Sequence, residues 1–441
     1  MLRFINVLLN RKAPTPYKTG EFILRACKRS VNLMLRSCYR LIGWVSSVGS
    51  IWTAKRKVVL FADKDRPTFF GYHYVTPFNK SETKILAMSV DASDTDVQSE
   101  CTPARVGYFK TDNVFSSPNE FNPVAETTTW CWQQGCMLQW HPWDEENLII
   151  FNSLVDGAYG SCLMNVESSE LIREYKYPIY SLSSCGNFAL TLNFARLGRL
   201  RPGYGYPLLP DATVDLLSPE DDGLFLLNLE SGQRDLLVSL SELAERNNDE
   251  GSEHYVNHAL FSPDGRWISF LHLFVTNAGK RKTYAYVYDR ESNDIRLLEA
   301  KRSISHHCWI NYNEFLLTTK DSNNRRRISV YGMDTQTRRD TISLNVSDTH
   351  PMKSPVDENT IVMDSYPDKF RNQHLYIGDI SNASVKKVAS LYSPREFSGQ
   401  VRCDLHPRWD RTGRAIVVDT AIHGRRKMAL LRLDIKSQSS F

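Results

Sequence analysis

The 441-residue sequence lacks the short motifs of several large enzyme classes. It has no nucleophile elbow, P-loop, dinucleotide-binding fingerprint or kinase signature, so hydride and phosphoryl transfer have no support. Its nine cysteines form an odd set without a CxxC pair, and the closest two, Cys131 and Cys136, have four residues between them. This spacing fits neither a zinc cage nor a disulfide framework, and a reducing compartment is the simplest interpretation.

Acidic residues are nearly absent from residues 1–57, where Glu21 alone stands against twelve Lys or Arg. The whole chain carries a net charge of only +4, so the rest of it is net acidic. Apolar residues recur with helical spacing, and we expect a basic amphipathic helical extension over residues 1–60. No apolar run is long enough to cross a bilayer, and charges throughout the segment argue against a secretory signal.

The basic segment has three possible roles. It can bind an anionic membrane surface, pack on the rest of the protein, or contact nucleic acid. No recognised motif accompanies the basic charge, so we expect no nucleic-acid partner. The expected location is the cytoplasm, with peripheral attachment to the inner membrane through residues 1–57.

One pattern recurs along the rest of the chain. His258 precedes Phe261 by three residues, a Ser-Pro-Asp-Gly turn follows, and Trp267–Leu271 alternates as a strand does. The same register fits six other places, which begin at His73, Cys136, Tyr180, His306, His350 and His406. Seven copies, about fifty residues apart, predict an all-β, seven-bladed β-propeller over residues 61–441.

The repeat also selects four histidines. The position three residues before the anchor of each copy holds, in chain order, Val75, Met137, Ile179, His258, His306, His350 and His406. Equal positions in successive blades face the central channel, so four imidazoles are expected to meet there. Either they hold a divalent metal, with one histidine left for proton transfer, or each caps its own turn.

Carboxylates accompany two of these histidines. Asp348 and Asp404 each stand two residues before a histidine, on the same face of an extended segment. Each can orient the imidazole or join a metal shell. Asp364 ends a later strand of one of these copies, with Tyr366 nearby as a candidate substrate contact.

Two further segments are candidates for binding a sugar. Trp130, Trp132 and Gln134 combine aromatic planes with an amide, which suits a sugar-binding rim, although the tryptophans can equally fill the space between blades. Residues 195–211 contain three arginines and two tyrosines and are expected to form a mobile cationic loop, either solvated or bound to an acidic sugar. Its candidate contacts are Arg196, Arg199, Arg201 and Tyr204.

Several of these segments resemble a known family. His258–Pro263 with Phe270–His272, the Ser305–Trp309 turn and Asp404–Asp410 are similar to the corresponding blades of oligogalacturonate lyase-type propellers. Strands that end in Asp and a polar turn resemble propellers of the TolB type. The likeness covers residues 256–434 and is only architectural in the first three blades.

The resemblance implies a seven-bladed enzyme that cleaves short uronide chains by β-elimination with a manganese-type cation. His258 matches the base of the family, and His306 and His406 match metal ligands. Asp404 stands where the family has a further histidine, and the ligand glutamine has no secure match, Gln400 being merely nearby. His350 is an additional candidate ligand.

The function predicted from the sequence is therefore that of a metal-dependent lyase acting on an acidic oligosaccharide or polysaccharide. His258, or His272 on the following strand, would remove the proton, and Arg199 or Arg201 would neutralise the substrate. His306, His350, His406 and Asp404 would hold the divalent metal, with manganese as the expected ion. The alternative is a non-catalytic propeller that serves as a scaffold or glycan-binding protein at the inner face of a membrane.

Overall fold

The computed structural model describes residues 34, 38, 41, 45, 58–97, 101–111, 120–248, 251–276, 278–323 and 325–433. Apart from these four isolated positions, which are helical and exposed, the predicted basic extension lies outside the described residues. Within the described ranges, no helix has the length and apolar character that crossing a membrane requires.

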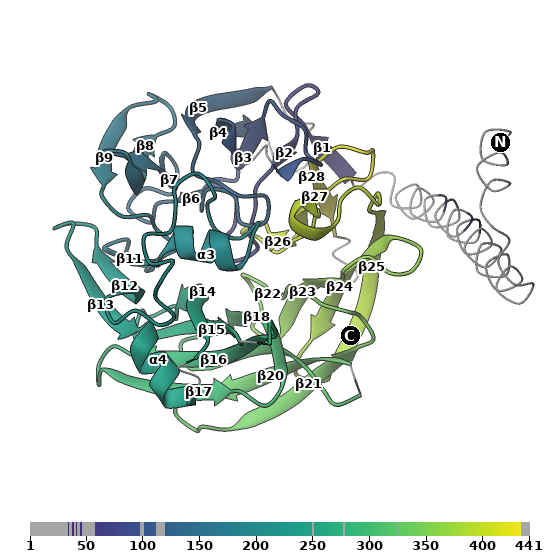
Figure 1. Ribbon diagram of the computed structural model, residues 1–441. Helices are drawn as coiled ribbons and strands as arrows, with labels where there is room; N and C mark the ends of the chain where they lie inside the picture. Colours follow the sequence, from purple (N-terminus) through teal and green to yellow (C-terminus); the bar gives the residue numbers. More distant parts are fainter. Residues whose placement is uncertain are drawn as a thin grey trace, which may run out of the picture.

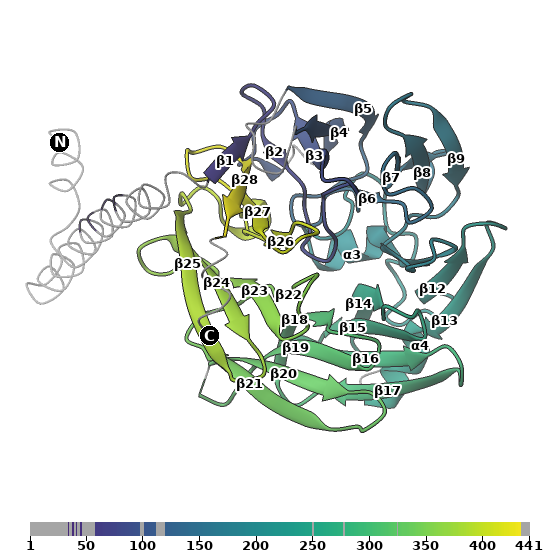
Figure 2. The same cartoon turned by 180° about the vertical axis from the view of Figure 1, so that it is seen from behind.

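Seven four-stranded antiparallel sheets surround a central axis, which confirms the all-β, seven-bladed propeller (Figures 1 and 2). The first blade contains β2 (Thr68–Phe69), β3 (Lys84–Val90), β4 (Ala104–Lys110) and β5 (Phe121–Thr127). The second contains β6 (Gln139–Trp140), β7 (Leu148–Val155), β8 (Ala158–Asn165) and β9 (Leu171–Tyr175). The third contains β10 (Ser181–Leu182), β11 (Phe188–Thr191), β12 (Gly223–Asn228) and β13 (Arg234–Ser239).

The next three blades follow in chain order. The fourth contains β14 (Glu253–Phe261), β15 (Trp267–Val275), β16 (Arg281–Asp289) and β17 (Asp294–Glu299). The fifth contains β18 (Ser303–Trp309), β19 (Glu314–Lys320), β20 (Arg326–Gly332) and β21 (Arg338–Leu344). The sixth contains β22 (Met352–Lys353), β23 (Thr360–Asp364), β24 (Asn372–Asp379) and β25 (Ser384–Tyr392).

The seventh blade joins the two ends of the propeller. It contains β26 (Arg408–Trp409), β27 (Ala415–Thr420) and β28 (Lys427–Arg432), and its outer strand is β1 (Val58–Phe61), from the other end of the chain. β1 pairs antiparallel with β28, and the buried Phe61 contacts Phe109 of the first blade, with ring centres 5.4 Å apart. The sheet thus includes residues 58–60, which the sequence analysis assigned to the extension.

Irregularities in the inner strands turn side chains toward the axis. The pairing of β14 with β15 shifts between Asn257 and Leu260, and that of β18 with β19 shifts between Ile304 and His307. His258 and His406 have left-handed φ values of 55° and 43°. A residue in such a bulge leaves the hydrogen-bond ladder, and its side chain points in a new direction.

Two α-helices accompany the third blade. α3 (Phe194–Leu200) begins after Asn193, whose side chain accepts a hydrogen bond from the Arg196 backbone amide, and it lies near the centre of the face in Figure 1. α4 (Leu240–Asn247) begins after Ser239, whose side chain accepts a hydrogen bond from the Glu242 backbone amide. A short 3₁₀ helix, η2 (Gly399–Val401), precedes the last inner strand.

Candidate metal centre

The four histidines selected by the repeat lie side by side at the axis. The ring centres of His258 and His306 are 5.6 Å apart, those of His306 and His350 are 4.1 Å apart, and those of His350 and His406 are 4.4 Å apart. All four side chains are almost completely buried. The predicted convergence of four imidazoles is therefore confirmed.

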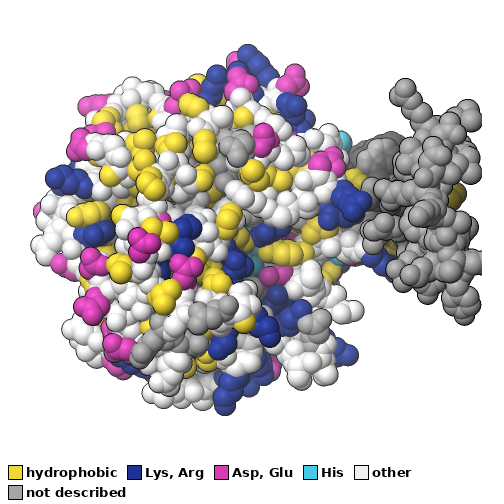
Figure 3. Space-filling model, viewed as in Figure 1, with side chains coloured by type: hydrophobic (Ala, Val, Ile, Leu, Met, Phe, Trp, Pro, Cys, Tyr) yellow, Lys and Arg dark blue, Asp and Glu magenta, His cyan; other side chains and the backbone are white. Residues whose placement is uncertain are grey.

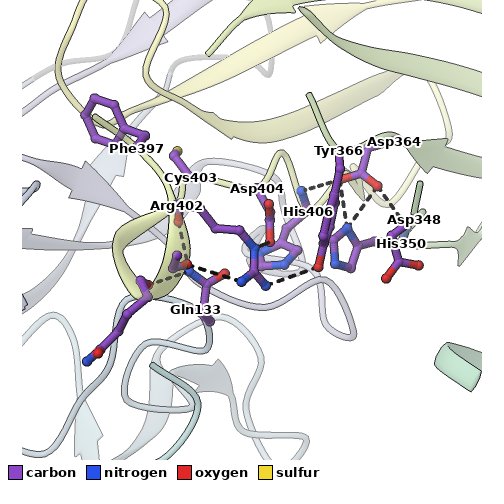
Figure 4. A network of polar contacts seen from close by, with 12 residues as sticks. Gln133, Asp348, His350, Asp364, Tyr366, Phe397, Arg402, Cys403, Asp404 and His406 are labelled. Carbon is purple, nitrogen blue, oxygen red and sulfur yellow. Dashed lines mark hydrogen bonds and ion pairs between the residues drawn. The ribbon is translucent and has the colours of Figure 1, made fainter. Parts of the chain in front are cut away.

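A neighbouring acceptor fixes the Nδ1 atom of three rings. Nδ1 of His306 lies 3.1 Å from the backbone oxygen of Thr349, and Nδ1 of His406 lies 2.8 Å from that of Gly71. Nδ1 of His350 lies 2.9 Å from both carboxylate oxygens of Asp364 (Figure 4). Since a carbonyl or carboxylate must accept, the proton resides on Nδ1, and Nε2 is the atom that can bind a metal.

Several atoms at the axis that could bind a metal make no hydrogen bond to another described residue. Donor atoms of His350, Asp404 and His406 all lie within 4.8 Å of one another. Among the described residues, Nε2 of His306, Nε2 of His350 and Oδ1 of Asp404 are buried without a hydrogen-bond partner. Buried polar atoms of this kind are costly unless a ligand satisfies them. These side chains therefore fit a divalent cation that accepts imidazole and carboxylate ligands.

The electrostatics of the centre differ from ring to ring. Burial lowers the pKa of His306 to about 4, with the His350 ring adding to this effect and Asp348 opposing it. Burial also acts on His350, but Asp364, with help from Asp404 and Asp348, raises its pKa to about 9. These shifts favour a positively charged, doubly protonated His350 and a neutral His306 at neutral pH in the absence of a cation.

His258 has a different environment from the other three. Its Nδ1 lies 2.8 Å from the hydroxyl of Tyr72 and 2.6 Å from that of Tyr74. Its Nε2 is buried without a partner in the described part of the chain. Burial, followed by the nearby Arg201 and His306, holds its pKa well below the usual value. A neutral imidazole in this position has the chemistry of a general base.

Arg402 and Tyr366 border the centre on the side of Asp404 (Figure 4). The Arg402 guanidinium donates to Asp404 over 2.6 Å and to the Tyr366 hydroxyl over 3.1 Å, and it also bonds the Tyr204 hydroxyl. The Arg201 guanidinium lies 3.9 Å from the centre of the Tyr204 ring. No hydrogen bond or ion pair ties its side chain to another described residue. Arg201 is thus the available cation next to the centre.

The other two arginines of the insertion have structural roles. The prediction of a mobile cationic loop is therefore wrong for the segment that carries Arg196 and Arg199. Arg196 is buried and donates to the backbone oxygens of His254, Thr213, Leu216 and Leu217. Arg199 makes ion pairs of 2.9 Å with Asp211 and 2.7 Å with Glu253. Their guanidinium groups hold the insertion on the propeller, so neither is free for an acidic sugar.

The predicted sugar-binding rim of tryptophans is also wrong. Trp130 and Trp132 are buried and pack against Phe69, with ring centres 5.9 Å and 5.2 Å from it. They fill space beside the first blade, the alternative that the sequence left open. Gln134 is buried too, and its amide donates to the Tyr180 hydroxyl over 2.7 Å.

His272 lies outside the axial cluster. Its Nε2 is 2.8 Å from Nδ1 of His254, and its Nδ1 is 3.2 Å from the side-chain nitrogen of Asn247. Both ring nitrogens are thus engaged, one by His254 of β14 and the other by Asn247 of α4. The strand that carries His272 brings it beside His254 and not beside the candidate metal ligands, so His258 is the better candidate for the base.

Sequence reasoning missed the contribution of the first blade. Tyr72, His73 and Tyr74 lie between β2 and the bridge that pairs Phe78 with Ile85, and they reach the axis. Alignment of the seven copies placed Val75 at the axial position of the first blade, because the alignment requires the same register in every blade. The available signal was the run Gly71–Tyr74, in which the imidazole that begins a copy of the repeat stands between two phenols.

Most of the centre is hidden from solvent. The space-filling view shows hydrophobic, basic and acidic side chains mixed over this face, with very little histidine in view (Figure 3). The exposed fraction is 3% for both Asp404 and His406. Among the residues that border the centre, Arg201 and Arg402 are only partly buried.

Comparison with known proteins supports the fold. No family model matches the sequence, and no curated protein matches it. An oligogalacturonate lyase in complex with manganese is similar in structure, with a TM-score of 0.61 and 12% identity over 86% of this chain and 97% of that chain. An oligogalacturonate lyase from Vibrio parahaemolyticus gives a TM-score of 0.58 and 12% identity, with the same coverage. TolB from Acinetobacter baumannii gives 0.38 and 14% identity over 74% of this chain and 63% of that chain.

Proposed function

We propose that this protein is a metal-dependent lyase that cleaves an acidic oligosaccharide by β-elimination. The observation that carries the proposal is the buried axial group of His350, Asp404 and His406, whose donor atoms lie within 4.8 Å of one another. Further support comes from the similar fold of an oligogalacturonate lyase that contains manganese. The substrate would be a short chain of uronic acids.

The residues that would hold the cation are His306, His350 and His406, through Nε2, and Asp404, through Oδ1. When bound, a divalent cation acts as a Lewis acid toward the uronate carboxylate and makes the adjacent ring proton more acidic. Thr349, Asp364 and Gly71 hold the three rings in position through Nδ1. The centre is thus organised before substrate arrives.

His258 is the proposed base. Its neutral ring takes the proton from the carbon next to the carboxylate, the bond between the following carbon and the glycosidic oxygen breaks, and a carbon–carbon double bond forms. The released oxygen takes a proton from water and leaves as a hydroxyl group. The hydroxyls of Tyr72 and Tyr74 orient the ring through Nδ1. Arg201, which has no ion-pair partner among the described side chains, neutralises the carboxylate of the substrate.

A direct assay tests this function. Purified protein is incubated with short uronide chains and manganese, and the ultraviolet absorbance of the conjugated product is followed. We expect activity that is lost in His258→Gln and in His350→Ala and retained in His272→Gln, a matched change at a buried histidine of the same blade. Equal activity in His258→Gln and the unchanged protein would reject His258 as the base.

A non-catalytic metal-binding propeller is the second candidate. The observation that favours it is the burial of the centre, since none of the four axial histidines is more than 3% exposed. A scaffold or glycan-binding protein with a structural metal would bind the cation and the oligosaccharide without forming an unsaturated product. The assay above, combined with a measurement of oligosaccharide binding, separates the two functions.

We also propose that the protein is cytoplasmic and attaches to the inner membrane through residues 1–57. The excess of basic residues in this segment supports an interaction with anionic lipid. Because the propeller begins with β1 at Val58, removal of residues 1–57 leaves every blade complete. Membrane fractionation of the shortened protein tests the attachment, which is rejected if its distribution does not change.

A further inference from the structure

His73 is a buried imidazole that the proposed mechanism does not use. Its side chain is completely buried, and neither of its ring nitrogens has a hydrogen-bond partner within the described ranges. Its ring centre lies 5.8 Å from that of His306, 5.2 Å from that of His350 and 5.8 Å from that of His406. An imidazole with two unsatisfied nitrogens is therefore surrounded by the three candidate histidine ligands.

These separations suit rings that share one metal ion. A metal about 2.1 Å from an imidazole nitrogen lies about 3 Å from the ring centre, so two ligand rings have centres about 4–4.5 Å apart at a right angle and about 5–6 Å apart at a tetrahedral or wider angle. The three separations from His73 match the wider angles, and the separations of 4.1 Å and 4.4 Å from His350 to its two neighbours match the right angle. His258 differs, since among the candidate ligand histidines its ring contacts only His306 within the described part of the chain.

The segment that carries His73 is fixed in place by the last blade. The backbone amides of Phe70 and Gly71 donate to the two carboxylate oxygens of Asp419 over 3.1 Å and 3.2 Å. Arg408 donates from Nε to the backbone oxygen of Tyr72 over 2.9 Å and pairs with the Asp419 carboxylate over 2.8 Å. Gly71 has a φ of +113°, and a Cβ atom there would lie 2.8 Å from the backbone of Gln134.

His406 belongs to the same arrangement. Its Nδ1 bonds the Gly71 oxygen, two residues before His73, while its other nitrogen is left for the candidate metal centre. The backbone that presents His73 is thus also the partner that orients the ring of His406. A ligand supplied by such a segment is positioned before the metal binds.

We propose that His73 is a ligand of the same metal, so that the ion is held by four imidazoles, from His73, His306, His350 and His406, and by the Asp404 carboxylate. This inference rests on the metal centre of the proposed function and adds a ligand from the first blade. A shell with four imidazoles suits zinc, cobalt and nickel, whereas oxygen-rich shells suit manganese. Because His73 adds an imidazole to the shell, the protein binds zinc or cobalt more tightly than manganese.

Two measurements on the full chain test the assignment. Cobalt(II) is titrated into the metal-free protein and its visible spectrum is recorded, and X-ray absorption of the zinc-loaded protein counts the bound imidazoles. The variants are His73→Phe, which retains a ring, His73→Gln, which retains polarity, and His350→Ala. His141→Gln is the matched control at a buried histidine outside the cluster.

We expect four imidazoles in the unchanged protein and three in both His73 variants, with cobalt affinity lower by at least about tenfold and an altered spectrum. His141→Gln should match the unchanged protein. Three imidazoles in the unchanged protein would overturn the inference even if every variant failed to fold. Cobalt binding that is lost in His350→Ala but unchanged in the His73 variants would overturn it and leave the proposed function standing. Absence of metal binding in the unchanged protein would overturn both.

Discussion

Nδ1 of His350 lies 2.9 Å from each carboxylate oxygen of Asp364, and both residues are fully buried. The same carboxylate accepts the backbone amide of His350 over 2.8 Å and that of His406 over 3.1 Å. One aspartate thus orients two candidate ligands from neighbouring blades. Its position at the end of β23 explains how a carboxylate distant in sequence reaches the axis.

Asp364→Asn should weaken metal binding without removing a ligand. The amide cannot accept in the same way at both oxygen positions, so the His350 ring loses its fixed tautomer and orientation. We expect the manganese or zinc affinity to fall by about 10–100-fold, measured by calorimetry. Asp379→Asn, at the other end of the next strand, is the control and should bind as the unchanged protein does. Equal affinities in the two variants would contradict this role.

The ion pair between Arg408 and Asp419 should contribute strongly to stability. Both side chains are buried, with nitrogen and oxygen 2.8 Å apart, and together they hold the segment that follows β2. Arg408→Met leaves the Asp419 charge without its partner, and we expect a loss of about 3–5 kcal/mol in the free energy of unfolding in urea. Adding Asp419→Asn should recover part of this loss. If the double variant were less stable than Arg408→Met, the argument from an uncompensated charge would fail.

The metal-free protein should lose stability in mild acid. Burial lowers the pKa of His141 and His306 to about 4 and that of His307 to about 3, so these rings stay neutral in the folded chain. Below pH 6.5 the unfolded chain binds protons that the folded chain does not, and the free energy of unfolding therefore decreases from about pH 6.5 toward pH 4. His350 has a raised pKa, so the stability it contributes is complete below about pH 6.5 and is lost only as the pH rises toward 9, outside this window.

Urea unfolding at several pH values checks this expectation. His141→Gln removes one depressed group outside the axial cluster, so its slope should be smaller by up to about 1.4 kcal/mol per pH unit. A stability that stays level between pH 7 and pH 5 would show that the buried histidines are already protonated.

A single substitution in β1 should show how much the closure of the propeller contributes to the free energy of unfolding. Phe61 is fully buried between the last and first blades, and Phe61→Ala removes its contact with Phe109. We expect a loss of about 3–5 kcal/mol in the free energy of unfolding. Leu60→Ala, a change on the same strand at a partly exposed position, should cost clearly less. Similar losses would mean that the pairing of β1, and not the burial of Phe61, provides the stabilisation.

The sequence predicted the propeller and the four axial histidines because the blades repeat. The strand that precedes each turn keeps one register, so His258, His306, His350 and His406 could be selected by counting from an aromatic anchor. The repeat could not predict the closing strand β1, since pairing between the two ends of the chain leaves no local pattern.

Other parts of the centre depend on contacts that no short pattern contains. His73 escaped the count because the inner strand of the first blade is interrupted between Phe69 and Phe78, which shifts its register. Arg196 and Arg199 looked available because a sequence does not show that distant carbonyl oxygens and carboxylates engage them. Trp130 and Trp132 have the composition of a sugar-binding surface, but burial, which depends on the packing of blades, decides their role.

The most direct test of the metal centre is elemental analysis of the purified protein after incubation with manganese and zinc, beside His350→Ala and His406→Ala. The account predicts one metal ion per chain in the unchanged protein and a large loss in both variants. His272→Gln, at a buried histidine outside the cluster, should retain the metal. Metal content that is negligible in the unchanged protein, or equal in all four proteins, would contradict the account.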